Sequence, residues 1–222
     1  MSKVVLVVAA HSDDEALGCA GTLAKHVESG DIVHLFFLTD GIGARLGSDE
    51  DKNNRVIATE ISANALGVES YDFAEFPDNQ MDSVPLLDIV KCIESKIKSI
   101  EPDIIYTHHG GDLNVDHRLT QQAVLTASRP QPWNKVKEIY AFEVLSSTEW
   151  QTLNEPPFLP NVFVDISPFI DKKRESLSAY KEEMRDPPHS RSIENTINLS
   201  KYRGNTVGVA YAEAFVLLRY IK

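Results

Sequence analysis

Four residues near the start of the chain carry side chains that could do chemistry, namely His11, Asp13, Asp14 and Glu15. Three adjacent carboxylates repel one another, and the N-cap of a helix needs only one of them. A divalent cation among them would relieve the repulsion, so one interpretation of this cluster is a metal site. Acidic residues are also favoured at a helix N-terminus by the macrodipole alone, so helix capping by Ser12 or Asp13 is the other interpretation.

A second cluster of the same kind occurs in the middle of the chain. Asp112, Asp116 and His117 follow the apolar run 104–107 and precede a helical pattern. Two imidazoles, one carboxylate and a position open to water make the donor set of a catalytic zinc site. Together the two clusters predict a metal centre, with Zn²⁺ as the first choice and another divalent ion as the alternative.

Both clusters follow segments that are expected to be strands. The valine-rich run 4–9 is typical of a buried strand, and apolar residues at helical spacing follow it over 16–27. Further strands are expected at 31–38, 71–74, 103–107, 138–144 and 163–166, and further helices at 53–66, 85–100, 118–128 and 168–184. This alternation predicts an α/β fold of Rossmann-like type, a mostly parallel sheet flanked by helices. Ligands bind such sheets outside the carboxyl ends of the strands, where both clusters, Asp40 and Asp78 fall.

Composition limits the class of protein. The 222 residues suffice for a single domain over 1–222, and the 42% hydrophobic and 25% charged content is ordinary for a globular protein. A net charge of −11 argues against nucleic acid as a partner. Because no apolar run reaches about 18 residues and no signal peptide is recognisable, we expect no membrane span and a cytoplasmic location.

The glycine-bearing loop 39–47 contains a Gly-x-Gly pattern. A dinucleotide-binding fingerprint would follow the first strand and open a helix directly, which this pattern does not. The acidic stretch 48–52 would also repel phosphate. We therefore expect a loop beside the site.

The chain resembles the PIG-L or LmbE-like family of metal-dependent de-N-acetylases, which act on N-acetylglucosamine-type sugars. The family's first motif, Ala/Pro-His-Pro-Asp-Asp-Glu, matches residues 10–15 with Ser12 in place of the proline, and its second motif ends at the pair 116–117. Arg55, the Pro-Asp pair at 77–78 and the segment 211–215 add support. The resemblance implies an LmbE-like architecture for the predicted sheet.

The resemblance also implies the roles of the clustered residues. His11, Asp14 and His117 would bind the metal, usually zinc, and Asp13 would be the general base. The chemistry agrees with this division, because a bound zinc ion lowers the pKa of water to about 7 and an adjacent carboxylate can carry the proton. Asp116 would orient an imidazole.

Substrate contacts and oxyanion stabilisation are less directly indicated. Arg55 and Asp78 are expected to hold sugar hydroxyls or a phosphate, although Arg55 could instead lie on a solvated helix face. Asn114 stands where some members carry a histidine that assists oxyanion stabilisation, and its amide can donate a hydrogen bond but supplies no positive charge. His108 and His109 are further candidates for oxyanion stabilisation. The alternative is that they are structural histidines, hydrogen-bonded at the end of a strand.

We therefore expect a zinc-dependent hydrolase that removes the acetyl group from an N-acetylated amino sugar or sugar conjugate and releases acetate. One alternative is a metal-dependent hydrolase of a non-sugar amide or ester. The other is a nucleotide- or sugar-binding protein without catalysis, in which the acidic clusters only cap helices. The resemblance also suggests that several copies of the chain assemble into a homo-oligomer.

Overall fold

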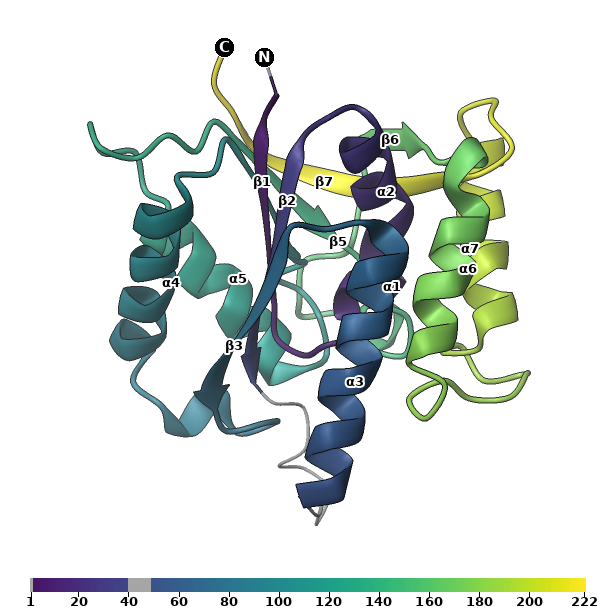
Figure 1. The fold of residues 1–222 in the computed structure, drawn as a ribbon, viewed down its shortest axis with the longest axis horizontal. Helices are drawn as coiled ribbons and strands as arrows, with labels where there is room; N and C mark the ends of the chain where they lie inside the picture. Colours follow the sequence, from purple (N-terminus) through teal and green to yellow (C-terminus); the bar gives the residue numbers. More distant parts are fainter. Residues whose placement is uncertain (1, 40–48) are drawn as a thin grey trace.

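The computed structural model describes residues 2–39 and 49–222, with side chains from residue 53 onward in the second range. The described part of the chain builds one seven-stranded sheet with helices on both faces (Figure 1). The strands are β1 (Val4–Ala9), β2 (Ile32–Thr39), β3 (Ser70–Phe76), β4 (Ile104–His108), β5 (Glu138–Phe142), β6 (Val162–Asp165) and β7 (Ala212–Tyr220). The α-helices are α1 (Asp14–Gly18), α2 (Ala20–Glu28), α3 (Asp49–Leu66), α4 (Leu86–Ile100), α5 (Val115–Ala127), α6 (Ile170–Ala179) and α7 (Ile193–Asn205).

The order of strands across the sheet is β3-β2-β1-β4-β5-β7-β6. The five strands from β3 to β5 are parallel, whereas β7 runs antiparallel to both β5 and β6. The predicted edge strand near 163–166 is present as β6. The architecture confirms the expected α/β, Rossmann-like fold with a mostly parallel sheet flanked by helices.

Each face of the sheet has its own hydrophobic core. Along β1, Val5 and Val7 belong to one core, and Leu6 and Val8 belong to the other, as the alternation of side chains in a strand requires. Helices α1, α2, α3, α6 and α7 cover the first face, and α4 and α5 cover the second (Figure 1). Full burial of one such aliphatic side chain contributes about 1.5–3 kcal/mol, so the valine-rich run holds β1 at the centre of the fold.

The sheet brings the two predicted clusters to the same edge. Strands β1 and β4 are parallel neighbours, so the residues after Ala9 and after His108 emerge side by side. The backbone N–H of Ala10 donates a hydrogen bond to Nε2 of His108 over 2.9 Å, which ties the two strand ends together. The fold therefore predicts that the two clusters meet. Asp40 and most of the loop 39–47 lie outside the described residues.

Two errors in the predicted helix boundaries concern the site. The expected helix 16–27 is two helices, because Cys19 between them has a φ of −146°, outside the helical region. The expected helix 118–128 begins at Val115, because the side chain of Asn114 caps it by accepting a hydrogen bond from the backbone N–H of Asp116. The pair 116–117 therefore lies in the first turn of α5 rather than ahead of it.

The helices with a polar buried face were predicted least well. Helix α3 exists, but Val56, Ile57 and Ile61, which indicated it, are 44–51% exposed. Its buried face carries polar side chains as well as Ala63 and Leu66. Helix α7 was not predicted and α6 ends at Ala179 rather than near 184, and the buried residues of α7 are Thr196, Ile197, Ser200 and Gly204.

Within the described ranges, none of the helices combines the length and the apolar character that crossing a membrane requires.

Candidate active site

The turn between β1 and α1 gives the first cluster its geometry. Asp13 has a φ of +138°, a conformation that costs an L-residue free energy and recurs at functional sites. Glu15 stabilises this turn, since its Oε2 accepts the backbone N–H of Asp13 over 3.0 Å, and its Oε1 accepts the Tyr180 hydroxyl over 2.7 Å. Neither Ser12 nor Asp13 caps α1 through its side chain. Capping alone therefore does not account for the acidic cluster.

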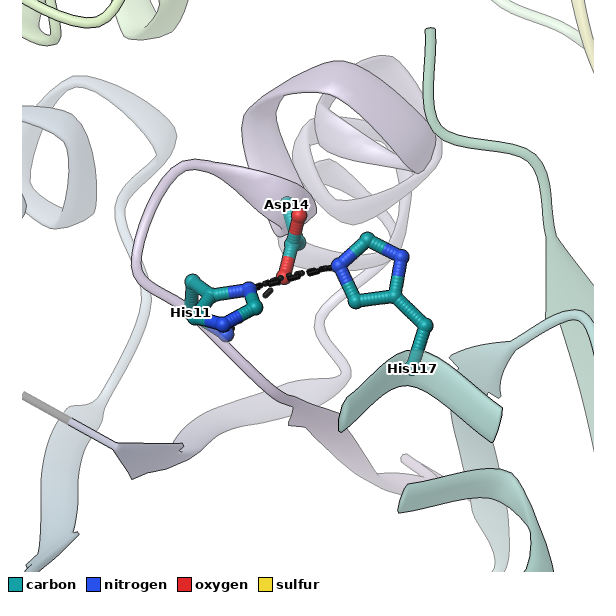
Figure 2. Close-up of side chains that lie close together, drawn as sticks. All are labelled: His11, Asp14 and His117. Atoms are coloured by element: carbon teal, nitrogen blue, oxygen red, sulfur yellow. Dashed lines mark hydrogen bonds and ion pairs between the residues drawn. The ribbon is translucent and has the colours of Figure 1, made fainter. Parts of the chain in front are cut away.

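Three side chains from the two clusters converge at one point (Figure 2). Nδ1 of His11 lies 3.3 Å from Oδ2 of Asp14 and 3.3 Å from Nε2 of His117, and the last two atoms are 3.5 Å apart. Ligand atoms around a tetrahedral zinc ion, each about 2.0–2.1 Å from it, lie about 3.4 Å apart. All three residues are buried. Their separations and chemistry therefore fit a divalent metal such as zinc.

Carboxylates stand behind both imidazoles. Nε2 of His11 lies 3.1 Å from Oδ1 of Asp78 and 3.4 Å from Oδ2 of Asp116, and Nδ1 of His117 lies 3.1 Å from Oδ1 of Asp112. A metal-binding histidine commonly donates its second N–H to a carboxylate in this way, which fixes the ring and raises its basicity. Each imidazole thus has one nitrogen in the converging set and one that faces a carboxylate.

The electrostatics of the cluster favour a cation. Although burial disfavours the charged imidazole, Asp14 and Asp112 raise the pKa of His117 to about 9. Burial likewise opposes ionisation of Asp14, but His117 and His108 hold its pKa well below the usual value. The buried carboxylates therefore retain their negative charge and, without a metal, draw protons onto the imidazoles. A bound divalent ion would supply the positive charge instead.

Asp13 contacts two arginines and is not one of the three converging residues. Its Oδ2 accepts a hydrogen bond from Nη1 of Arg191 over 3.0 Å, whereas its Oδ1 has no hydrogen-bond partner in the described part of the chain. Nη2 of Arg55 lies 3.6 Å from that Oδ1. Burial raises the pKa of Asp13, and the two arginines oppose that effect. A buried carboxylate oxygen that accepts no hydrogen bond from the described residues is suited to accept a proton.

The structure also places the predicted substrate residues. Arg55 is 9% exposed, so it does not lie on a solvated helix face, and its Nε donates to the Ser12 hydroxyl over 2.9 Å. Asp78 is 3% exposed and contacts His11. The geometry thus supports a role for Asp78 in orienting that imidazole, and its predicted contact with substrate stays a prediction.

Asn114 and Asp116 are engaged with the backbone of neighbouring segments. The amide of Asn114 accepts from the N–H of Asp116 and donates one of its two N–H groups to Oδ1 of Asn79 over 3.0 Å, and its role in oxyanion stabilisation stays a prediction. Asp116 accepts the backbone N–H groups of Asn79 and Met81, over 2.7 and 3.1 Å. This contact fixes the carboxylate that lies 3.4 Å from Nε2 of His11, and the role of Asp116 in orienting an imidazole stays a prediction.

His108 and His109 make structural contacts at the end of β4. The ring of His108 stacks on that of His117 with centroids 3.9 Å apart, and its Nε2 accepts the N–H of Ala10. Nε2 of His109 donates to the backbone oxygen of Pro156 over 2.8 Å. These contacts favour the structural interpretation of both residues.

Sequence reasoning missed two functional contacts. It included Asp112 in the second cluster but did not identify it as the partner of His117, and it gave Arg191 no role. Asp112 directly follows the strand end and was open to such an interpretation. No local pattern marks Arg191, because its link to Asp13 joins residues far apart in the chain.

Comparison with known families agrees with this geometry. The family model described as PIG-L, GlcNAc-PI de-N-acetylase, matches residues 6–128, more than half of the 222-residue chain. The chain therefore belongs to the PIG-L family of de-N-acetylases, and the expectation of a hydrolytic de-N-acetylase is confirmed at the level of the family. The matched region contains the three converging residues and ends before Arg191.

Individual relatives show how far the family ranges. The chain is 28% identical to an uncharacterized deacetylase from Escherichia coli (strain K12), covering 74% of this chain and 82% of that protein. It is 26% identical to a probable N-acetyl-alpha-D-glucosaminyl L-malate deacetylase 2 from Bacillus cereus, with 86% and 90% covered. It is also 28% identical to 4-oxalmesaconate hydratase from Pseudomonas putida, with 77% and 70% covered.

Solved structures share the whole fold. A conserved protein from Thermus thermophilus superposes with a TM-score of 0.81 at 25% identity, covering 100% of this chain and 97% of the other. The N,N'-diacetylchitobiose deacetylase from Pyrococcus horikoshii also has a TM-score of 0.81, at 21% identity, with 98% and 84% covered. The expected LmbE-like architecture is confirmed.

Proposed function

We propose that the protein is a zinc-dependent hydrolase that removes the acetyl group from an N-acetylated amino sugar or N-acetylglucosamine-type sugar conjugate. One observation carries the proposal. Three buried ligand atoms from His11, Asp14 and His117 lie 3.3–3.5 Å apart, and Oδ1 of the neighbouring Asp13 is buried without a hydrogen bond from the described residues.

The chemistry divides between the metal and Asp13. A divalent ion held by the three ligands supplies Lewis acidity and lowers the pKa of water. Asp13 accepts at Oδ1 the proton of the attacking water, whose oxygen bonds to the carbonyl carbon of the acetyl group. The carbon–nitrogen bond then breaks, and Asp13 returns the proton to the amine nitrogen. The products are acetate and the free amine.

The charge around Asp13 favours a neutral acetamide as the reacting group. Arg191 contacts Asp13, and Nη1 of Arg55 lies 2.5 Å from Oε1 of Glu183, so these two guanidinium groups already have carboxylate partners. An acetamide needs no counter-ion. We further propose that Arg55 and Asp78 contact the sugar, since positioning the acetamide accelerates its hydrolysis.

A hydratase reaction is the second candidate, because one relative is a hydratase and activation of water is common to both reactions. In that case water adds to a double bond and no acetate is released. A binding protein without catalysis would need no bound metal. It would also have no use for a buried carboxylate oxygen such as Oδ1 of Asp13, which accepts no hydrogen bond from the described residues.

Metal content and product release together test the proposal. Protein purified without a metal-affinity tag should contain about one zinc or similar ion per chain. His117→Ala should lose that ion, whereas His34→Ala, which changes a partly buried histidine bonded to Ser70, should keep it. A panel of N-acetylglucosamine compounds should give acetate with wild type and with Asp72→Asn, an exposed control, and none with Asp13→Asn. Absence of metal after reconstitution, or wild-type acetate release by Asp13→Asn, would contradict the proposal.

A further inference from the structure

Arg191 reaches the site from the segment between α6 and α7. The backbone of this segment is fixed, since the N–H of Arg185 donates to the carbonyl oxygen of Arg191 over 3.0 Å. The N–H of Arg191 donates to Nδ1 of His189 over 3.0 Å, and the next residue, Ser192, is the N-cap of α7. The base of the Arg191 side chain is therefore held independently of the metal cluster.

The guanidinium group of Arg191 joins two other segments. Its Nε donates to the hydroxyl of Ser146 over 2.8 Å, and its Nη1 donates to Oδ2 of Asp13 over 3.0 Å. A guanidinium group is planar, so two hydrogen bonds through different nitrogens fix its orientation. Ser146 follows β5 and Asp13 follows β1, so the contact connects three parts of the carboxyl edge of the sheet.

This contact makes the two oxygens of Asp13 inequivalent. The terminal torsion of an aspartate is broad, so an unrestrained carboxylate could present either oxygen. Here Oδ2 is bound by Arg191, while Oδ1 is buried without a hydrogen-bond partner among the described residues. Arg55 does not bind Oδ1 by a hydrogen bond, because its Nη2 is 3.6 Å from that oxygen, beyond the range of a hydrogen bond.

We propose that Arg191 is a positioning residue that holds Asp13 by Oδ2, so that Oδ1 is the oxygen that accepts the proton during deacetylation. The inference rests on the proposed function, which assigns the base. The matched family region ends at residue 128, so that match assigns nothing to Arg191.

The first test needs neither substrate nor metal. Thermal midpoints are measured for wild type, Arg191→Ala, Asp13→Asn and the double variant, all in chelator. If the contact exists in solution, the two shifts are not additive, and Arg191→Ala lowers the midpoint less than half as much when Asp13 is already Asn. Arg185→Ala is the matched control, because this exposed arginine donates only to backbone oxygens, and its effect should be the same in both backgrounds.

The second test measures catalysis. Displacement of a reacting group by about 1 Å can cost about 100-fold in rate, so kcat of Arg191→Ala should fall by about that factor. KM and metal content should stay within twofold of wild type, which a general folding defect would not produce. Added methylguanidine should restore part of kcat in Arg191→Ala and none in Asp13→Asn, and Arg191→Lys should retain more activity than Arg191→Ala.

The outcomes separate the two proposals. Additive midpoints, or a wild-type kcat in Arg191→Ala, overturn the role of Arg191 and leave the deacetylase assignment intact. A similar loss of kcat in Arg191→Ala also overturns the role of Arg191 if methylguanidine restores nothing and KM is raised, since Arg191 would then act on substrate binding. If wild type releases no acetate, the proposed function fails, and with it the catalytic meaning of the contact, whatever the midpoints show.

Discussion

The imidazole of His117 has Nε2 toward the candidate metal ligand Asp14 and Nδ1 toward Asp112, 3.1 Å from Oδ1 of that carboxylate. Burial opposes ionisation of Asp112, but His117 and the hydroxyls of Ser147 and Thr148 hold its pKa well below the usual value. Asp112 is therefore a permanent negative charge behind one ligand. It also links the loop after β5 to the metal centre.

Asp112→Asn should weaken metal binding by about 10–100-fold, the range typical for partners of metal-binding histidines. The amide keeps the size of the side chain but removes the charge that makes His117 a stronger ligand. Competition with a chromophoric zinc chelator measures the affinity. Asp72→Asn, on the half-exposed side chain that pairs with Lys96, is the control and should bind as wild type. An unchanged affinity of Asp112→Asn would show that the contact has no influence on the metal.

Glu15 should make stability depend on pH. Burial raises its pKa to about 7 from 4.5, so the protonated form is favoured in the folded state. The stability contributed by this group is complete below pH about 4.5 and is lost as pH rises through about 7. In metal-free protein, the free energy of unfolding of Glu15→Gln relative to wild type should therefore rise between pH 5 and pH 8. The rise is up to about 3 kcal/mol, at about 1.4 kcal/mol per pKa unit.

Urea denaturation at the two pH values measures this difference. Tyr180 and the backbone of Asp13 donate to different oxygens of Glu15, and Gln keeps only one of these two acceptors, so the variant carries a constant loss and only the change of the difference between the two pH values is compared. Glu60→Gln, on the exposed side of α3, should show no such trend. A constant stability gap between Glu15→Gln and wild type across this range would refute the assignment.

The sequence was informative where the buried side chains of an element are apolar and where the residues of the site are close together in the chain. Strand β1 was predicted because a central parallel strand is buried on both faces and needs a continuous apolar run. The predicted ligands His11 and Asp14 are three residues apart, so the sequence alone shows their spacing. Helix α7 was missed because its buried face is mostly polar or small, and apolar periodicity does not detect such a face. Arg191 was missed because only the folded chain brings it to Asp13.

The buried ion pair between Lys173 and Glu213 is a stability determinant that the sequence analysis did not assign. Lys173 Nζ lies 2.6 Å from Glu213 Oε1, and both side chains are at most 3% exposed. Glu213 also accepts the backbone N–H groups of Gly21 and Thr22 in the first turn of α2. The pair therefore joins α6, β7 and the start of α2.

Lys173→Met should destabilise the fold by about 3–5 kcal/mol, because it leaves the buried carboxylate of Glu213 without its cation. The double variant Lys173→Met/Glu213→Gln should lose less than the sum of the single losses. Lys172→Met is the matched control. Its ion pair with Glu175 is more than half exposed on both sides, so its loss should cost at most about 1 kcal/mol. Chemical denaturation measures these variants and Glu213→Gln alone, four in all, and an equal loss at positions 172 and 173 would contradict the assignment.

Two adjacent glycines after β4 should respond differently to alanine. A Cβ at Gly111 would lie 2.0 Å from the backbone oxygen of Pro156, which cannot yield without moving its loop, whereas the atoms nearest to a Cβ at Gly110 belong to the end of the flexible Gln121 side chain. Gly111→Ala should break the hydrogen bond from His109 to Pro156, cost about 1–3 kcal/mol and speed proteolytic cleavage within 151–158. Gly110→Ala should leave both stability and cleavage close to wild type. Equal cleavage rates in the two variants would show that the loop is not held by this close approach, and that its position depends on the hydroxyl contacts to Asp112 instead.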